Sequence, residues 1–211
     1  MYIMNIAISA GPNFLLYLNR KCAIIRIVPL RVTGGLSPCQ LRWTVNFERK
    51  SMIYDEDWIL RPMVPEDYDK VRRLWLSIKG FGIRSIDDSR EDIERFIKRN
   101  PSTSVVACVG DRIVGSILCG NDGRQASFYH VCVARSYRRR GIGTAMVIHC
   151  MNTLRKLKIN KITLIAFTSN DAGNAFWKQI GWTFRTDCNY YEFLLNEENI
   201  TRFIESETEE Y

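Results

Sequence analysis

The chain has 211 residues, 46% of them hydrophobic, which is enough for one sizeable core and favours one domain with an appendage over two full domains. Its formal net charge of +7 comes from the first quarter of the chain: residues 1–51 hold seven basic residues and one acidic residue, whereas residues 52–211 hold 23 basic and 22 acidic residues. The nearly neutral main part gives no reason to expect a nucleic-acid-binding protein.

The cysteines and histidines argue against a disulfide-bonded protein and against a metal site, and the apolar segments argue against a membrane span. Seven cysteines are scattered through mostly apolar segments without a CxxC pair, which is typical of free thiols in a reducing compartment, so we predict a cytoplasmic protein. His130 and His149 lie apart from matching ligands, so no metal site is predicted. The apolar stretch 1–18 is interrupted by Gly11-Pro12 and is shorter than the roughly 20 residues of a membrane span, so no membrane partner is predicted.

The beginning of the chain lacks a clear structural period. Residues 19–51 mix basic residues with Gly34-Gly35 and Pro38, and no helical or strand pattern is sustained there. We therefore predict that residues 1–51 form a poorly structured or loosely packed N-terminal extension. A start at Met52 would give a self-sufficient domain, residues 52–211, with a solvated acidic tail at its end, Glu205–Glu210.

The pattern becomes regular from Trp58 onwards. A strand is predicted at Trp58–Pro62, followed by a helix that opens at Pro65 with acidic residues in its first turn. A second helix has Asp88 or Ser89 as its N-cap and ends near Asn100. Three β-rich runs then follow across Gly- and Asp-containing turns and predict an antiparallel meander: Ser104–Val109, Arg112–Leu118 and Ala126–Val133.

The last third of the chain returns to alternating helices and strands. The expected elements are a helix from Gly143 to about Leu157, a strand at Lys161–Ala166, a helix from Asp171 to Ile180, and closing strands at Trp182–Arg185 and Tyr190–Leu195. The order β-αα-βββ-α-β-α-ββ indicates a mixed α/β (α+β) protein. The strands Ala126–Val133 and Lys161–Ala166 are expected to run parallel to each other, joined by a right-handed crossover through the helix between them.

An arginine-glycine run lies directly between a predicted strand and a predicted helix, at Arg138–Thr144. Such a turn presents unpaired backbone N–H groups at the positive end of a helix, and glycine lets a phosphate approach that backbone closely. The spacing fits neither the P-loop pattern GxxxxGK[ST] nor the dinucleotide pattern GxGxxG. The segment therefore predicts a diphosphate site that serves neither nucleotide hydrolysis nor hydride transfer.

The spacing Arg138-x-x-Gly141-x-Gly143 resembles the Q/R-x-x-G-x-G/A acetyl-CoA motif of the GNAT acetyltransferase superfamily. Downstream, Asn170, Asn174–Trp177 and Gly181-Trp182 resemble the N-x-x-A-x-x-F-Y-x-x-x-G-F block of that family. The likeness in architecture covers residues 58–195, and the closest group resembles bacterial stand-alone acetyltransferases related to the ribosomal-protein alanine acetyltransferases. It implies a mostly antiparallel sheet of about seven strands flanked by about four helices.

The resemblance also implies acetyl-CoA as co-substrate and an amine as acceptor. Backbone groups of one strand would pair with the pantetheine arm, amides of the loop would bind the pyrophosphate, and two asparagines would flank the thioester end. The implied cofactor-binding residues are Val131, Cys132, Val133, Arg138, Arg139, Arg140, Gly141, Ile142, Gly143, Thr144, Asn170, Asn174 and Trp177.

The catalytic groups are less clear, because Trp177 stands where the family commonly has a tyrosine that protonates the departing thiolate. An indole N–H is not an acid near neutral pH. Tyr190 or Tyr191 on the last predicted strand could serve instead, or the thiolate takes its proton from water or substrate. His130 is the candidate base, with Tyr129 expected on the opposite face of the same strand.

The predicted activity is N-acetyltransferase: a primary amine of a small molecule or peptide attacks the thioester directly in a ternary complex, and the Val131 or Cys132 amide stabilises the oxyanion. Two alternatives stay open. One is a non-catalytic acyl-CoA-binding or regulatory module, favoured by Trp177, and the other is an RNA-associated basic protein that uses residues 20–50. A homodimer is also left open.

Overall fold

The computed structural model describes residues 24–29, 43–48 and 58–208, and the chain divides into two compact units, Met1–Ile53 and Tyr54–Tyr211. In the first unit, β1 (Ile24–Pro29) pairs antiparallel with β2 (Trp43–Glu48). Most of the predicted loose extension lies outside the described residues. Its described part is this pair of strands.

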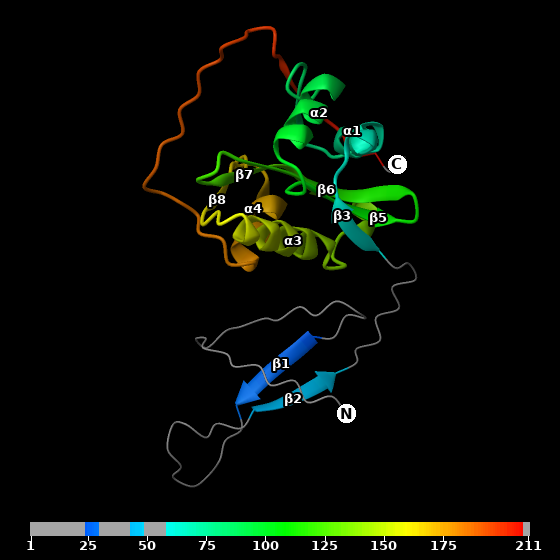
Figure 1. Ribbon diagram of the computed structural model, residues 1–211, viewed down its shortest axis with the longest axis vertical. Helices are drawn as coiled ribbons and strands as arrows, with labels where there is room; N and C mark the ends of the chain where they lie inside the picture. Colours follow the sequence, from blue (N-terminus) through cyan, green and yellow to red (C-terminus); the bar gives the residue numbers. More distant parts are fainter. Residues whose placement is uncertain (1–23, 30–42, 49–57, 209–211) are drawn as a thin grey trace. The chain divides into compact units, whose positions relative to one another are not determined.

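The second unit is built on a five-stranded sheet of order β3-β5-β6-β7-β8 (Figure 1). The first four strands are antiparallel neighbours, and β8 runs parallel to β7. The predicted meander and the crossover around a helix are therefore confirmed. The strand bounds are β3 Ile59–Pro62, β5 Val105–Val109, β6 Arg112–Asn121, β7 Ala126–Val133 and β8 Ile162–Leu164.

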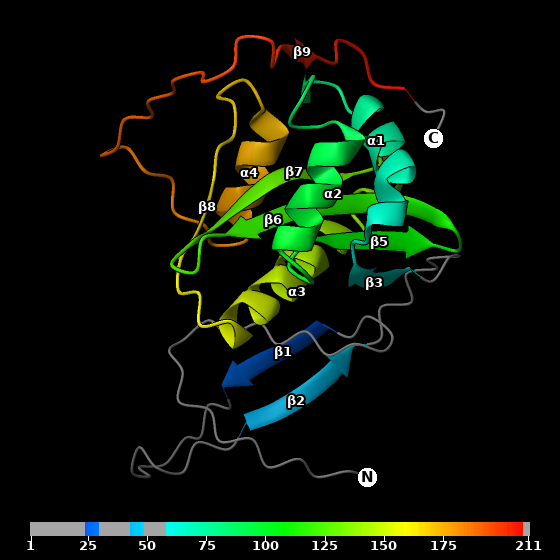
Figure 2. The same cartoon turned by 45° about the horizontal axis from the view of Figure 1, so that its top comes forward.

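Two pairs of helices cover the two faces of this sheet (Figures 1 and 2). One face carries α1 (Tyr68–Leu76) and α2 (Arg90–Arg99), and the other carries α3 (Ile142–Lys156) and α4 (Asp171–Gln179). The predicted ends of α2, α3 and α4 agree with the observed ends within two residues. For the first helix only its start at Pro65 is predicted, and that first turn is the 3-10 helix η1 (Pro65–Asp67).

Apolar side chains on both faces of the sheet form one continuous core. Trp75 of α1 and Met146 of α3 are fully buried on opposite faces, and the central strands between them contribute their own buried valines and isoleucines. The helices are amphipathic and bury one stripe each, so burial of that stripe rather than helix propensity holds them in place.

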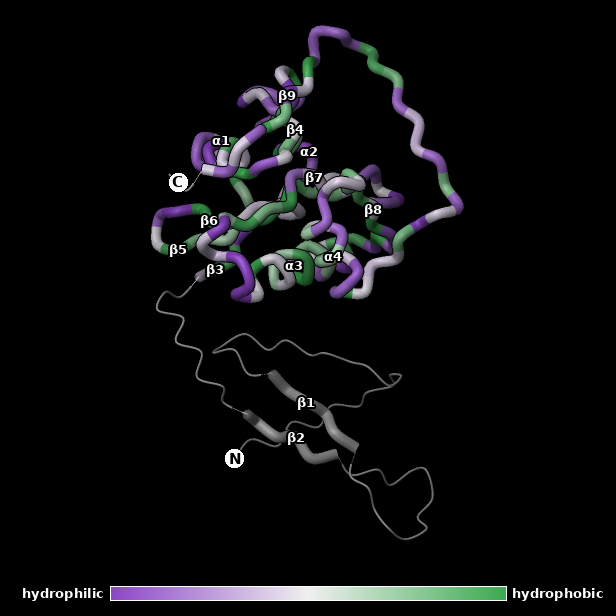
Figure 3. The backbone as a smooth tube through the Cα atoms, turned by 180° about the vertical axis from the view of Figure 1, so that it is seen from behind, coloured by the Kyte–Doolittle hydropathy of each residue, from purple (hydrophilic) through white to green (hydrophobic). Residues whose placement is uncertain are grey.

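The two predicted closing strands, Trp182–Arg185 and Tyr190–Leu195, are wrong: within the described residues 182–200, no strand is present. The segment leaves the sheet as a long arc, and Figure 3 shows hydrophobic positions along it. The side chains of Tyr191, Phe193 and Leu195 are at least 85% exposed. The β-rich composition of this segment predicted strands, but a strand also needs a partner, and in the structure nothing in the described part of the chain pairs with the outer edge of β8.

Two short strands that were not predicted from the sequence pair with each other outside the main sheet. β4 (Gly82–Arg84) lies between α1 and α2 in the sequence and pairs antiparallel with β9 (Thr201–Phe203), which is near the end of the chain (Figure 3). Each has three residues, too few for a hydrophobic period to be recognised. Their pairing carries the C-terminal residues back to α1.

Candidate active site

The Arg138–Thr144 loop joins β7 to α3 through the 3-10 turn η2 (Arg135–Tyr137). Gly141 is the N-cap of α3 and has φ +81°, and Arg139 has φ +65°. Left-handed residues alternating with other residues turn successive N–H groups toward one side, which makes an anion-binding concavity. The first hydrogen bond of α3 runs from the Ala145 N–H to the Gly141 carbonyl at 3.0 Å, so the three amides before Ala145 precede the helical ladder.

The two glycines of the loop differ in what the structure requires of them. A Cβ at Gly141 would meet no atom within 4 Å, so its requirement is conformational, because a positive φ is unfavourable for other residues. A Cβ at Gly143 would lie 3.4 Å from Cζ of Phe176 and 3.8 Å from Cγ2 of Val133. These are ordinary van der Waals distances, so the packing of α3 against β7 and α4 would accept a Cβ at Gly143.

The three consecutive arginines have three different environments. Arg140 donates to the Ser136 carbonyl at 2.9 Å and lies 4.9 Å from the ring centroid of Tyr137. Arg138 donates from Nε to the Val133 carbonyl at 3.0 Å and forms an ion pair with Glu207. Arg139 is exposed and makes no hydrogen bond or ion pair with another described side chain, so it is the cation that is most available to a phosphate.

Glu207 is a part of this site that the sequence did not reveal. The predicted acidic tail was expected to be solvated from Glu205 onwards, but the Glu207 side chain is only 20% exposed because it lies against Arg138 and, at 4.0 Å, Arg135. The Gly80 N–H donates to the Ile204 carbonyl at 2.8 Å and the Ile204 N–H donates to the Phe81 carbonyl at 2.9 Å, and these bonds hold the tail here beside the β4–β9 pairing. The expectation is therefore wrong at Glu207, where long-range pairing that no sequence pattern signals draws the carboxylate onto the loop.

The edge of β7 opens beside the loop. β7 and β8 pair only from Ala126 to Phe128, and no strand of the described chain continues the pairing beyond Phe128 on that side. Val131 and Val133 lie in the unpaired stretch and are half-buried. The backbone of this stretch is where an extended ligand arm could add as a strand.

A β-bulge interrupts β7 at the same place. The register with β6 changes from Leu118 opposite Tyr129 to Ser116 opposite Cys132, so two residues of β7 face one residue of β6. The extra residue changes the alternation of side chains. The Tyr129 ring contacts the ring of Phe96 in α2 edge-on, with centroids 6.0 Å apart, and the His130 ring contacts Trp75 in α1. Both side chains therefore lie on the face of the sheet that α1 and α2 cover. The prediction that they occupy opposite faces is wrong.

His130 lies in the bulge with φ +47°, an uncommon conformation for a residue other than glycine. Its Nε2 is 2.7 Å from Oδ1 of Asp88, and its ring centroid is 4.4 Å from that of Trp75 and 5.4 Å from that of Phe81. The Asp88 and His130 side chains are 6% and 16% exposed. Of the two predicted N-cap residues of α2, Asp88 and Ser89, it is Ser89 that caps the helix, by accepting from the Asp92 N–H.

Cys132 follows the bulge and points to the α1 side of the sheet. Its Sγ is 3.5 Å from Oγ of Ser116, which also accepts a hydrogen bond from the Trp75 indole at 2.9 Å. Burial raises the pKa of the Cys132 thiol to about 12. A thiol that stays protonated near neutral pH is a poor nucleophile, so Cys132 does not fit the role of an acyl carrier.

The residues of the downstream block lie at α4. Asn170 caps this helix by accepting from the Gly173 N–H at 2.9 Å, and Asn174 donates to the Phe167 carbonyl at 2.9 Å. Trp177 packs in an aromatic cluster, with ring centroids 5.0 Å from Phe176 and 4.8 Å from Trp182. The structure thus shows a structural contact for each of these residues.

The two candidate acids lie in the irregular segment after α4. Tyr190 is 63% exposed and donates its hydroxyl to Glu192 at 2.9 Å, a bond that raises the pKa of the tyrosine. Tyr191 is 85% exposed. Neither lies on a strand, and the structure shows no hydrogen bond from either to His130 or to the loop.

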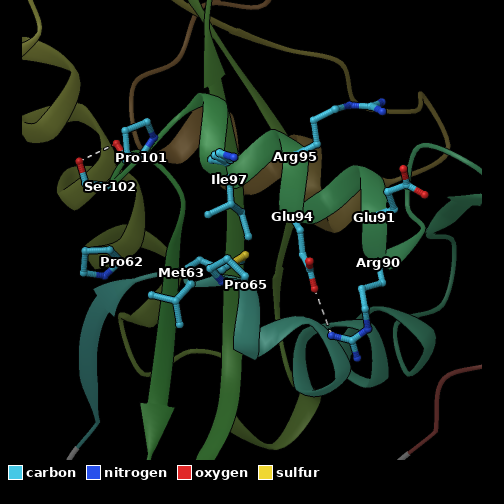
Figure 4. Close-up of a pocket in the computed structure, with 12 residues that line it drawn as sticks. Pro62, Met63, Pro65, Arg90, Glu91, Glu94, Arg95, Ile97, Pro101 and Ser102 are labelled. Atoms are coloured by element: carbon cyan, nitrogen blue, oxygen red, sulfur yellow. Dashed lines mark hydrogen bonds and ion pairs between the residues drawn. The ribbon is translucent and has the colours of Figure 1, made fainter.

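A separate hollow on the described surface lies away from this loop. It has a volume of about 900 Å³ and is formed by β3, the turn after it and α2 (Figure 4). Its lining includes Met63, Ile97 and the Arg90–Glu94 ion pair, but neither His130 nor the Arg138–Thr144 loop. In the described residues, no three metal-ligating side chains come together, and none of the described helices has the length and hydropathy of a membrane span.

Comparison with known proteins identifies this architecture. The sequence model of the acetyltransferase (GNAT) family matches residues 68–182, which include the bulge, the loop and α4. The chain belongs to the GNAT acetyltransferase family. The resemblance seen in the Arg138–Gly143 spacing is thereby confirmed, and the protein is an N-acetyltransferase by family.

Among curated relatives, an acetyltransferase of Sodalis glossinidius is 31% identical over 115 residues, which cover 54% of this chain and 80% of the relative. An acetyltransferase of Photorhabdus laumondii is 32% identical over 115 residues, 54% of this chain and 78% of the relative. The matched parts amount to most of each relative.

Solved structures share the fold at lower sequence identity. The PaiA N-acetyltransferase of Thermoplasma acidophilum, determined with coenzyme A, has a TM-score of 0.54 and 14% identity over 69% of this chain and 96% of that protein. Ard1 of Thermoplasma volcanium has a TM-score of 0.51 and 22% identity over 59% and 81%. The mixed α/β GNAT fold is confirmed, whereas the predicted seven-strand order is not reproduced in full.

Proposed function

We propose that this GNAT protein transfers the acetyl group of acetyl-CoA to a primary amine in a ternary complex. The observation that carries the proposal is the Arg138–Thr144 loop, with its left-handed Gly141 and its free amides at the start of α3. Coenzyme A presents a diphosphate to such amides and a pantetheine arm to a strand edge. The open edge of β7 at Val131 and Val133 lies directly before this loop.

In the proposed reaction, the amine nitrogen attacks the thioester carbon, the C–S bond breaks, and the coenzyme A thiolate leaves with a proton. The oxyanion receives a hydrogen bond from the Val131 or Cys132 amide in the bulge. No covalent enzyme intermediate is required, and the protonated Cys132 thiol is consistent with that. The acceptor amine needs a base, for which His130 is our candidate.

Proton delivery to the thiolate is assigned to water or to the substrate. Trp177 supplies no acid, and the Tyr190 hydroxyl is already bonded to Glu192. The buried free cysteines support a reducing compartment such as the cytoplasm, and residues 52–211 are proposed to carry the whole activity.

The experiment is to incubate the purified protein with acetyl-CoA and a panel of small amines and N-terminal peptides, while following free-thiol release and the acetyl mass gain of each acceptor. We expect thiol release that depends on one class of amine and matches the acetylated product in amount. Trp177, which stands where the family commonly has a tyrosine, favours one alternative, a non-catalytic acyl-CoA-binding module. Tight binding of acetyl-CoA without turnover across the whole panel would establish that alternative.

A further inference from the structure

Asp88 is a nearly fully buried carboxylate for which the proposed acetyl transfer so far supplies no role. Its side chain is 6% exposed, and both of its oxygens are engaged: Oδ1 faces Nε2 of His130 at 2.7 Å, and Oδ2 accepts the Arg84 N–H at 2.7 Å. The backbone carbonyl of Asp88 accepts the Tyr68 hydroxyl at 2.9 Å. A buried carboxylate in such a position holds its orientation through these bonds.

The contact with Asp88 determines which nitrogen of His130 carries the proton. An ionised carboxylate can only accept hydrogen bonds, so Nε2 must be the donor in the Asp88–His130 pair. A neutral imidazole has one N–H and one lone pair, and with the proton on Nε2 the lone pair lies on Nδ1.

The His130 ring is also fixed in orientation. Trp75 and Phe81 pack against the ring at centroid distances of 4.4 Å and 5.4 Å, and the Trp75 indole is itself bonded to Ser116. The His130 side chain is 16% exposed, so it is not sealed in the core. The left-handed backbone of His130 places a residue in a costly conformation, as is common at functional sites.

His130 is near the proposed acetyl site as well. The parallel pairing of β7 with β8 ends at Phe128, two residues before His130, so the imidazole lies where the strand edge opens. Val131, whose amide is a candidate oxyanion donor, is the next residue in the chain. Two consecutive residues of the bulge would therefore act on the reactants: His130 as the base for the amine, and the Val131 amide as a hydrogen-bond donor to the thioester oxygen.

We infer that Asp88 is the positioning residue that fixes His130 with its proton on Nε2, so that Nδ1 is the base for the acceptor amine. The inference rests on the proposed acetyl transfer. Nδ1 takes one proton from the acceptor ammonium and later releases it to solvent. The neutral amine attacks the thioester carbon, the C–S bond breaks, and the second nitrogen proton passes to the coenzyme A thiolate.

The surroundings of the imidazole make Asp88 the electrostatic partner that matters. The elements packed against His130 present Trp75 and Phe81, which do not titrate, and the hydroxyl of Ser116, which lies 3.4 Å from the His130 carbonyl. Cys132 nearby is a protonated thiol. Among the described residues, Asp88 is the charged side chain that contacts the ring.

The first experiment reads the tautomer directly and needs no activity. The chain has two histidines, so ¹⁵N NMR of the imidazoles in the whole protein, with His149→Gln for assignment, isolates His130. At pH values where the ring is neutral, we expect the shift of Nε2 to be that of a protonated nitrogen and the shift of Nδ1 to be that of a lone pair. Asp88→Asn should change this pattern, because an amide can donate to Nε2. A proton on Nδ1 in the unsubstituted protein, or shifts that are unchanged by Asp88→Asn, would overturn the inference.

The second experiment measures acetyl transfer to the best amine of the panel as a function of pH. Asp88→Asn and His130→Gln should each lower kcat by about 100-fold or more, while acetyl-CoA affinity is kept and the low-pH limb of the profile changes position or disappears. The matched control is Asp87→Asn, because Asp87 is adjacent but its carboxylate accepts from the Arg84 guanidinium and its backbone N–H donates to Asn199, with no bond to His130. Equal profiles for Asp87→Asn and Asp88→Asn would refute the role of Asp88. If the tautomer is as expected but no amine is acetylated, acetyl transfer fails and the positioning by Asp88 stands.

Discussion

At the scale of single residues, Asp67 shows how a buried charge fixes the entry into α1. Its side chain is 7% exposed and accepts two hydrogen bonds from the Arg61 guanidinium, at 2.6 and 2.7 Å, and one from the Val64 N–H at 3.0 Å. Burial alone would raise the pKa of this carboxyl, but the bonds from Arg61 and Val64 outweigh it and hold the pKa below its usual range. The ionised form is therefore the one that the fold stabilises.

Asp67→Asn is expected to lower the free energy of unfolding by about 1–3 kcal/mol at neutral pH, since it leaves Arg61 partly buried without its charged partner. A lowered native pKa gives stability that is present above roughly pH 4, where an unfolded aspartate is ionised, and that is lost as the pH falls through the native value. Urea denaturation at pH 7 and pH 3 checks this. The difference between the two proteins should shrink at pH 3, and an equal difference at both pH values would contradict the argument.

Which residues of the site could be predicted depended on how local their signals are. The glycine loop at Gly141 and Gly143 follows a strand and precedes a helix that are adjacent in sequence, and the structure shows the positive φ at Gly141. Asp88 and Glu207 lie 42 and 69 residues from the partners they contact, His130 and Arg138. Such pairings depend on the tertiary fold, so no spacing rule indicates them.

At the scale of elements, the predictions agree with the structure where a periodic pattern is long and is buried on one face. α3 is 15 residues long with a buried stripe at helical spacing, and β7 was predicted with its observed ends. The segment at Tyr190–Leu195 has the composition of a strand but no partner in the described chain. The bulge at His130 escaped prediction because one extra residue changes the register without any change in composition.

The C-terminal strand β9 brings Glu207 onto the Arg138–Thr144 loop, so the tail is expected to compete with coenzyme A if this loop binds the pyrophosphate as proposed. Glu207→Gln should tighten acetyl-CoA binding about threefold, because the partly exposed ion pair with Arg138 must be given up when a phosphate binds. Isothermal titration calorimetry measures the change. Glu205→Gln, two residues away and exposed, serves as the control. Equal affinities for the two variants would show that the tail carboxylate does not compete.

At the scale of the whole molecule, the division of the chain at residues 53 and 54 assigns the sheet, the bulge and the loop to one unit. The GNAT family match, residues 68–182, lies wholly within that unit. The excess of basic residues in the sequence ends near the same place, at residue 51. The sequence does not predict the β1–β2 pairing in the first unit, because no sustained strand pattern is visible there.

Residues 54–211 alone are therefore expected to fold and to bind acetyl-CoA with the affinity of the whole chain. The physical reason is that the core cluster and every proposed cofactor contact belong to this unit. Thermal unfolding followed by circular dichroism, together with acetyl-CoA titration, compares the two proteins. A chain 54–211 that fails to unfold cooperatively, or that loses acetyl-CoA affinity, would show that residues 1–53 complete the domain.

The central claim is that the backbone of the Arg138–Thr144 loop holds the pyrophosphate of acetyl-CoA, and a pair of matched glycines tests it most directly. Gly141 and Gly123 have φ +81° and +85°, and a Cβ at either would meet no atom within 4 Å, so valine strains the backbone equally at both. The measurement is the Kd of acetyl-CoA for Gly141→Val and Gly123→Val. We predict at least about tenfold weaker binding for Gly141→Val and unchanged binding for Gly123→Val; equal affinities would contradict the assignment.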